Sequence, residues 1–533
     1  MHKLYVILFF FLFVFCSCSA SDLEDSVQSV EVSKLVMEGD RTYLEVDGIP
    51  FPLFGAQIRL DALVNCDKYP IEKIERYFAK ASDLGVNCVQ IPIWWNLIEP
   101  KGDKYEFDLV DNILAFALKY KLKIEILWFS TNMCGDSFSY LVPQYILNEP
   151  GKKLKRDNNA QFWGYYGYIY SLKLDDSWIL EREQKAVTKL FNHIREWDMD
   201  NGETHPVIVA QIHNEPDCLI RWRIDQYNIR FSEEKPLSKR EAWDMSLNAI
   251  DAVGQAVKLS NYKVATRVNV VKGTGISGYY EFPDAKPKDI FDLQGIDFVC
   301  VDPYKSTIEE IKSELMAYKS IIGNYPLIAE NKGTYQNTAS LILATAALGG
   351  GYNIYDLATS KYFIDNTSID NKTEIDHGVY TWDLQDKSHT NSIREILKGL
   401  VAAYPVVASS SSYDFAAFNI KQQYPLSECS QEISTTKNSI NFNTQNGAIG
   451  FCITADDLLF AYFTDKAVIK LSNGNYTSIC KGFFDKQGNF VDEGTVNMLP
   501  DNVLNAEKGV LYKINFSNDK SLVSTTIENI GSM

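Results

Sequence analysis

Eight short apolar runs, separated by segments of helical pattern, are the feature that most restricts the fold of this chain. The runs span 51–57, 86–93, 124–129, 207–212, 264–271, 296–301, 327–329 and 352–355. The segments between them read as helices and include 71–84, 109–120, 178–197 and 241–259. Strands that are apolar along most of their length are buried on both faces, which is typical of a parallel sheet covered by helices. Eight such strands predict an α/β protein with a closed (β/α)₈ TIM barrel.

A second domain is expected after the barrel. An Ala/Ser-rich joint at 408–412 follows the barrel pattern, and beyond it short alternating strands are broken by turn pairs such as Asn473-Gly474 and Gln487-Gly488. This rhythm predicts a C-terminal β-sandwich of ~120 residues. The expected division is a leader at 1–18, a tether at 19–30, the barrel with an N-terminal β-hairpin at 31–407, and the sandwich at 408–533.

The first twenty residues are typical of an export signal. Lys3 gives a positive start, and the apolar run at 4–15 is too short to span a bilayer comfortably. The run ends in Ser17-Cys18-Ser19, which resembles a bacterial lipobox with Cys18 as the lipidated residue. We therefore expect a lipid-anchored protein of the bacterial cell envelope, on the periplasmic or surface face of the outer membrane. A plain cleaved signal is the alternative.

Charge and composition exclude some partners. A formal net charge of −17 provides no net attraction for phosphate groups, so neither nucleic acid nor an anionic membrane surface is expected as a partner. No Cys/His set has the spacing of a structural zinc site, and we expect no metal and no cofactor. Aromatic residues, at 13%, suit a carbohydrate-binding surface and a large core equally well.

Two apolar runs lead directly into a glutamate. The fourth run leads into Asn214-Glu215-Pro216, and the seventh leads into Glu330. In a barrel the catalytic residues gather where the strands end, so these two side chains are expected to meet. Retaining glycoside hydrolysis needs two carboxyl groups ~5 Å apart, one as proton donor and one as nucleophile. Glu215 and Glu330 are therefore the candidate catalytic residues, with a surface salt bridge or a helix cap as the alternative for each.

Other strand ends carry polar and aromatic side chains that we expect to bind the substrate. In chain order they are Gln57, Arg59, Trp95, Glu99, Trp128, Asn132, Asn214, Asn269, Tyr304 and Asn331. Tyr304 is expected to donate a hydrogen bond to the nucleophile and hold it ionised. Asp302 is either part of this group or the cap of a turn before Pro303. His213 is expected to orient or pack rather than to carry the proton.

The motifs around these residues resemble known enzymes. The segment 90–100, followed by Gly102 and by 105–108, resembles the second-strand signature of the family 35 and 42 β-galactosidases. Gln211-Ile212 with Asn214-Glu215 resembles their acid/base strand, and Asn214-Glu215-Pro216 also resembles the family 5 cellulases and mannanases. The chain is thus similar, over about 45–400, to glycoside hydrolase clan A.

This resemblance implies a retaining β-glycosidase of the β-galactosidase type, with Glu215 as acid/base and Glu330 as nucleophile. It implies an oligo- or polysaccharide substrate, with other glycan-utilisation proteins as partners. Pro92 stands where family 35 enzymes usually have Tyr, and His213 stands where they have Glu, so the similarity holds for the clan. The alternative function is a non-catalytic glycan-binding lipoprotein on a barrel scaffold, although binding alone does not require both glutamates.

Overall fold

The computed structural model describes residues 27–517, apart from 158–167, 272–285, 367–374, 410–412, 421–423, 437–438, 473–474 and 486–487. Eight parallel strands form a closed barrel within it: β5 (Phe54–Gln57), β6 (Cys88–Trp94), β7 (Lys123–Met133), β10 (Val207–Asn214), β12 (Ala265–Val270), β13 (Phe298–Val301), β14 (Leu327–Lys332) and β15 (Gly351–Tyr355). The last strand closes onto the first through pairs such as Asn353 with Gly55. The predicted barrel is confirmed.

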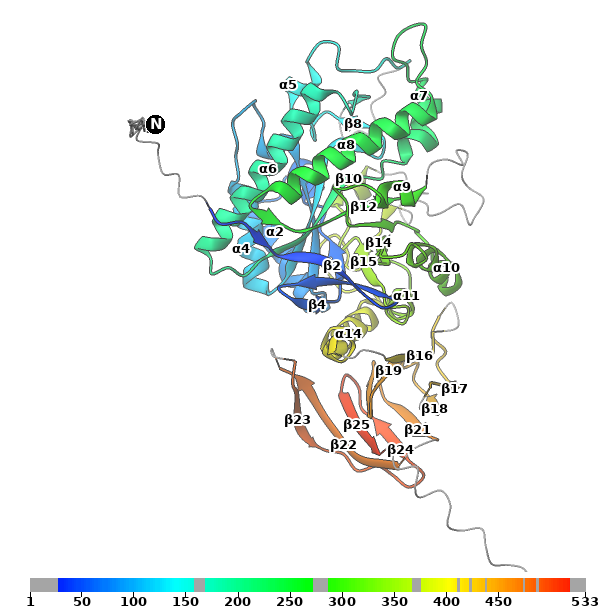
Figure 1. Cartoon of the computed structure of the whole chain (residues 1–533). Coiled ribbons are helices and arrows are strands. Elements are labelled where there is room, and N and C mark those ends of the chain that lie inside the picture. Colours follow the sequence, from blue (N-terminus) through cyan, green and yellow to red (C-terminus); the bar gives the residue numbers. More distant parts are fainter. Residues whose placement is uncertain are drawn as a thin grey trace, which may run out of the picture.

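Helices surround the barrel (Figure 1). The principal ones are α2 (Ile71–Leu84), α4 (Asp108–Tyr120), α6 (Ser177–Asp200), α8 (Lys239–Leu259), α10 (Ile308–Lys319), α11 (Thr338–Ala346) and α14 (Thr390–Ser409). Helix α2 ends as the sequence predicts, at Gly85 with φ 88°, a backbone conformation that glycine adopts without a steric penalty. Helix α8 begins with a capping box between Ser238 and Glu241.

Shorter elements complete the barrel domain. They are α1 (Leu60–Asn65), α3 (Trp95–Ile98), α5 (Gln144–Leu147), the π-helix η1 (Leu219–Arg223), α7 (Ile224–Tyr227), α9 (Pro287–Phe291), α12 (Lys361–Asp365), and the paired β8 (Ser137–Phe138) and β9 (Ile169–Tyr170). None of the described helices is both long and apolar enough to cross a membrane. The expected leader and its Cys18 lie outside the described residues.

The N-terminal hairpin is larger than expected. Strands β2 (Ser33–Glu38), β3 (Arg41–Val46) and β4 (Ile49–Phe51) form a three-stranded antiparallel sheet. Strand β1 (Val30–Glu31) pairs in parallel with β11 (Tyr262–Lys263). The first barrel strand consequently begins at Phe54 rather than at 51, because the preceding residues belong to β4.

Two barrel strands extend beyond their predicted ends, and this determines which side chains reach the site. Strand β7 was expected to end at 129 but continues to Met133, which pairs with Asn214 of β10. Strand β14 was expected to end at 329 but continues to Lys332, which pairs with Tyr355. Pairing with a neighbouring strand keeps both segments extended. Asn132 and Glu330 therefore lie inside strands instead of in the following loops.

The C-terminal domain is a β-sandwich, as predicted. One sheet contains β16 (Asp414–Phe418), β19 (Gly450–Ala455), β20 (Leu458–Phe463), β25 (Leu511–Ser517), β22 (Asn475–Phe484) and β23 (Phe490–Thr495). The other contains β17 (Cys429–Ser434), β18 (Ser439–Thr444), β21 (Ala467–Leu471) and β24 (Val503–Ala506). Phe442 of the second sheet stacks on Phe418 and Phe463 of the first, with ring centroids 5.1 and 5.5 Å apart. Helix α14 lies between the barrel and this domain (Figure 1), where Gly399 contacts the ring of Tyr462.

Candidate active site

Three carboxyl groups meet at the C-terminal end of the barrel. Glu215 follows β10 directly, Asp302 follows β13, and Glu330 belongs to β14. An oxygen of each lies within 4.8 Å of an oxygen of the other two. Asp302 and Glu330 are buried, whereas Glu215 is partly exposed. The structure thus brings together the two glutamates that the sequence singles out, and it adds Asp302 as a third carboxyl group rather than a turn cap.

The backbone beneath these side chains is irregular. The register of β10 against β7 shifts just before Asn214, and that of β14 against β15 shifts before Asn331. Bulges of this kind redirect a side chain and are common beside active sites. Glu215, with φ 47°, and Tyr304, with φ 48°, also occupy the left-handed region, at a cost of ~1–3 kcal/mol each. Such strained residues cluster at functional sites.

Two donors, one from β5 and one from the segment after β13, bind Glu330. Nε2 of Gln57 donates to Oε1 at 2.8 Å, and the hydroxyl of Tyr304 donates to Oε2 at 2.6 Å. Burial raises the pKa of Glu330, while these hydrogen bonds and the positive charges of Arg59 and Arg267 oppose the rise. Donors on both oxygens favour the ionised carboxylate, which is the form that a nucleophile requires.

Glu215 lies in a contrasting environment. The thiol of Cys134 donates to its Oε2 at 2.9 Å, and its backbone N–H donates to Oδ1 of Asn269 at 3.3 Å. Burial raises the pKa of Glu215 well above its ordinary value, and the negative charges of Asp302 and Glu330 add to this rise. A carboxyl group that keeps its proton near neutral pH is suited to donate it.

A chain of amides joins the two sides of the site. Gln211 and Asn269 both donate to Oδ1 of Asn214, at 3.0 and 3.1 Å, and Asn269 also donates to Oδ2 of Asp302 at 2.6 Å. Burial raises the pKa of Asp302 well above its ordinary value, and the charge of Glu330 raises it further. Carboxyl groups this close cannot all be ionised at once, so Asp302 helps to hold a proton within the cluster.

The same three carboxyl groups are also the only acidic cluster, among the described residues, with oxygens close enough to share a metal ion. Both oxygens of Glu330 already accept hydrogen bonds, from Gln57 and Tyr304, and one oxygen of Asp302 accepts from Asn269. A divalent cation would compete with these donors for the carboxylate oxygens. The expectation that no metal takes part stays a prediction.

Trp128 and His213 face away from this cluster. The indole N–H of Trp128 donates to Oε1 of Glu183 in α6 at 3.1 Å, and Nε2 of His213 lies 3.1 Å from the same oxygen. Ser130 and Thr131 donate to Glu183 as well. Burial acts to raise the pKa of Glu183, but the attraction to His213 and these hydrogen bonds outweigh it and the pKa is lowered. His213 and Trp128 therefore both contact α6, on the side of the strands away from Glu215 and Glu330.

Other expected binding residues serve the loops around the mouth. Trp95 donates to Oε2 of Glu99 at 2.7 Å, and Oε1 of Glu99 accepts from the backbone N–H of Asp103 at 2.7 Å. Asn331 donates to the carbonyl of Lys305 and to the hydroxyl of Tyr352, both at 2.9 Å. These contacts fix the segments that follow β6 and β13 and tie Asn331 to β15. They do not bring Trp95, Glu99 or Asn331 onto the two glutamates.

Two other expected binding residues, Arg59 and Asn132, make no hydrogen bond to either glutamate among the described residues. Arg59 pairs with Asp61 at 2.7 Å and donates to the hydroxyl of Tyr355 at 2.8 Å, and its charge acts on Glu330. Asn132 is buried near the end of β7, and neither its Oδ1 nor its Nδ2 has a hydrogen-bond partner among the described residues.

Two residues of the site are absent from the sequence-based prediction. Tyr355 ends β15, contacts Arg59, and has its ring centroid 6.0 Å from that of Tyr304. The rule that strand ends carry the site, applied to the eighth strand, would have found it. No sequence pattern marks Cys134, because its contact with Glu215 joins residues 81 positions apart and depends on a turn after β7.

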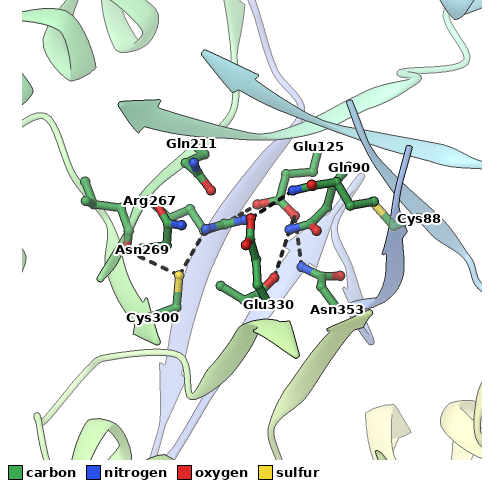
Figure 2. A network of polar contacts seen from close by, with 12 residues as sticks. Cys88, Gln90, Glu125, Gln211, Arg267, Asn269, Cys300, Glu330 and Asn353 are labelled. Atoms are coloured by element: carbon green, nitrogen blue, oxygen red, sulfur yellow. Dashed lines mark hydrogen bonds and ion pairs between the residues drawn. The ribbon is translucent and has the colours of Figure 1, made fainter. Parts of the chain in front are cut away.

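A layer of buried polar side chains lies within the barrel, on the strands that carry the site (Figure 2). Arg267 of β12 pairs with Glu125 of β7, and Gln90 and Asn353 each donate to Oε2 of Glu125 at 3.1 Å. All four are fully buried, in positions where barrels usually hold aliphatic residues. Arg267 forms an ion pair with Glu125, and its positive charge still acts to lower the pKa of Glu330.

Comparison with known proteins identifies similarities of two kinds. Residues 245–425 match a domain of unknown function (DUF4978). Among curated proteins, no sequence matches this chain. The fold is similar to a β-galactosidase from the Antarctic haloarchaeon Halorubrum lacusprofundi, with a TM-score of 0.47, 11% identity, and coverage of 66% of this chain and 58% of that one.

Two further solved structures are similar at the same level. A β-galactosidase from Marinomonas ef1 has a TM-score of 0.45 and 11% identity, and covers 67% of this chain and 60% of its own. A family 39 glycoside hydrolase from Bacteroides cellulosilyticus WH2 has a TM-score of 0.43 and 12% identity, covering 90% and 84%. The chain spans about six tenths of the length of the two β-galactosidases. These are similarities of fold, and the chemistry of this chain must follow from its own side chains.

Proposed function

We propose that this protein is a retaining β-glycosidase that hydrolyses O-glycosidic bonds of oligo- or polysaccharides. The observation that carries the proposal is the pair Glu215 and Glu330, whose carboxyl oxygens lie within 4.8 Å of each other in opposite environments. Retaining enzymes place these groups ~5–5.5 Å apart, and inverting enzymes place them ~6.5–9.5 Å apart to admit a water molecule. The close spacing supports retention.

The contacts of each glutamate support its role in a double displacement. A Glu330 oxygen attacks the anomeric carbon while the bond to the leaving oxygen breaks, and Glu215 gives its proton to that oxygen. Glu215, now ionised, then takes a proton from water, whose oxygen attacks the anomeric carbon and releases Glu330. Gln57 and Tyr304 favour the ionised form of Glu330 against the effect of burial. Asn214, fixed by Gln211 and Asn269, is placed to bind a sugar hydroxyl.

The proposal extends to substrate and location. β-Galactosides are the first substrates to test, because the motifs around the second and fourth strands resemble those of β-galactosidases. The proposed site of action is the bacterial cell envelope, through a lipid on Cys18 and beside other glycan-utilisation proteins. Palmitate labelling of wild type and Cys18→Ala would show whether the lipid is attached.

Turnover of aryl β-glycosides tests the activity directly. Wild type is assayed on galactosides, glucosides, mannosides and xylosides, together with Glu330→Ala, Glu215→Ala and, as a matched control, Glu309→Ala at an exposed position of α10. We expect at least one sugar to be released by wild type and by the control, and a loss of several orders of magnitude in Glu330→Ala. Full hydrolysis by Glu330→Ala would refute the nucleophile. Binding of glycans without turnover of any would instead support the non-catalytic alternative.

Azide separates the two roles. In Glu330→Ala, azide can occupy the space of the lost carboxylate, and we expect the α-glycosyl azide. In Glu215→Ala, azide replaces water in the second step, so the β-glycosyl azide is expected. The same anomer from both variants would contradict the assignment.

A further inference from the structure

Cys134 makes the one hydrogen bond to the carboxyl group of Glu215 found among the described residues. Its Sγ lies 2.9 Å from Oε2, and within the described part of the chain no side chain donates to Oε1. The thiol is partly exposed, like the carboxyl group that it contacts. The two oxygens of Glu215 are therefore distinct. Oε2 is held by sulfur, and Oε1 remains for the proton that passes to and from substrate.

The backbone fixes the position of this thiol. The N–H of Cys134 donates to the carbonyl of Asn214 at 2.8 Å, and its own carbonyl accepts from Nε of Arg223 at 3.2 Å. Its φ of 53° is in the left-handed region, as is that of Glu215. The next residue, Gly135, packs so tightly on Leu219 that a side chain there would strike the backbone. A strained, multiply anchored turn thus presents one thiol to one carboxyl group.

Two neighbouring side chains donate hydrogen bonds to Sγ of Cys134. Nδ2 of Asn214 points at Sγ from 3.4 Å, and Cys218, whose N–H donates to the carbonyl of Glu215 at 3.1 Å, contacts the same sulfur. A hydrogen bond from Cys218 is the largest cause of a lowered pKa at Cys134, burial opposes it, and the hydrogen bond with Glu215 adds to it. Burial raises the pKa of Cys218 well above its ordinary value, so Cys218 keeps its proton and remains a donor. Linked donors strengthen one another.

We propose that Cys134 is a positioning residue for Glu215, whose thiol fixes the carboxyl group so that Oε1 faces the leaving oxygen. This role rests on the proposed function, because it matters to catalysis only where Glu215 exchanges a proton. Cys134 does not touch the reacting bond. Loss of the Cys134 thiol leaves the nucleophile Glu330 intact and impairs proton donation by Glu215. The fall in kcat/KM must therefore depend on how much proton donation the leaving group needs.

The kinetic test uses paired substrates. A dinitrophenyl glycoside leaves without much help from an acid, whereas a phenyl glycoside needs it. General acid catalysis contributes ~10²–10⁴-fold. For Cys134→Ala we expect kcat/KM to fall about tenfold more for the phenyl than for the dinitrophenyl substrate, and Cys134→Ser, which keeps a donor, to recover most of the difference. Cys429→Ala, a partly exposed cysteine of the sandwich, is the control. Equal losses on both substrates, in a variant whose melting temperature matches wild type, would overturn the proposal.

A second measurement needs no turnover. Iodoacetamide alkylation of Cys134 is followed by peptide mass spectrometry in wild type, Glu215→Ala and Glu330→Ala at neutral pH. Alkylation requires the thiolate, and once the thiol has lost its proton a protonated Glu215 can donate to the sulfur, which lowers the pKa of Cys134. We therefore expect alkylation to slow severalfold in Glu215→Ala and to change less than twofold in Glu330→Ala. An unchanged rate in Glu215→Ala would refute the contact and with it the proposal. If alkylation responds as expected while no glycoside is cleaved, the contact stands, and both the proposed function and the positioning role that rests on it are refuted.

Discussion

Replacing Tyr304 by Phe removes one hydrogen bond from Glu330 and leaves the ring in place. The hydroxyl lies 2.6 Å from Oε2, a short distance for a donor to a carboxylate. A hydrogen bond to a charged group contributes ~1.5–3 kcal/mol, and ~1.36 kcal/mol corresponds to one pKa unit. Tyr304 is partly exposed, so water can replace part of the interaction, and the lower end of the range applies. We expect the pKa of Glu330 to rise by about one unit.

The direction of the effect on activity follows from the charge state. The bond favours ionised Glu330, so its loss raises the pKa and reduces the ionised fraction as the pH falls. The acid limb of kcat/KM should therefore move to higher pH by about one unit, with a loss of about tenfold on that limb. Tyr335→Phe is the matched control, because its hydroxyl donates to the backbone carbonyl of Tyr304 at 3.1 Å and not to the carboxylate. An acid limb that stays in place in Tyr304→Phe, or moves equally in Tyr335→Phe, would refute the reasoning.

Three further outcomes are expected. Gln57→Leu removes the other donor to Glu330 and should move the acid limb in the same direction, by about one unit in the same pH–rate profile; no shift would mean that the amide does not stabilise the anion. Arg267→Met leaves Glu125 as a buried unpaired charge and should lower the free energy of unfolding by ~3–5 kcal/mol, whereas adding Glu125→Gln should recover most of the loss in urea denaturation. Glu183→Ala deprives its buried donors of their acceptor and should lower the free energy of unfolding by ~3 kcal/mol or more, and an unchanged urea midpoint would contradict this.

The sequence predicts the barrel well because its signal is local. Each strand is buried on both faces, so a run such as 207–212 is apolar except for Gln211 and is recognisable without its neighbours. The meeting of Glu215 and Glu330 follows from the same pattern, because parallel strands bring their ends to one face. The C-terminal sandwich is predictable from alternation and turn pairs.

Side-chain direction near the strand ends was not predictable. Strand β7 continues four residues past its apolar run, so Asn132 lies inside the strand. Trp128 turns toward Glu183 in α6. The bulge before Asn214 breaks the simple alternation that would otherwise assign the faces of His213 and Glu215. The contact of Cys134 with Glu215 joins segments far apart in the sequence, and the order of residues carries no trace of it.

The stereochemistry of the first product tests the central claim most directly. An aryl β-glycoside that the enzyme cleaves is followed by ¹H NMR from the start of the reaction, before mutarotation mixes the anomers. Two carboxyl groups within 4.8 Å predict a double displacement, so the β-anomer of the free sugar should appear first and the α-anomer should grow in later. Initial release of the α-anomer would show a single displacement and would contradict the assignment of Glu330 as nucleophile.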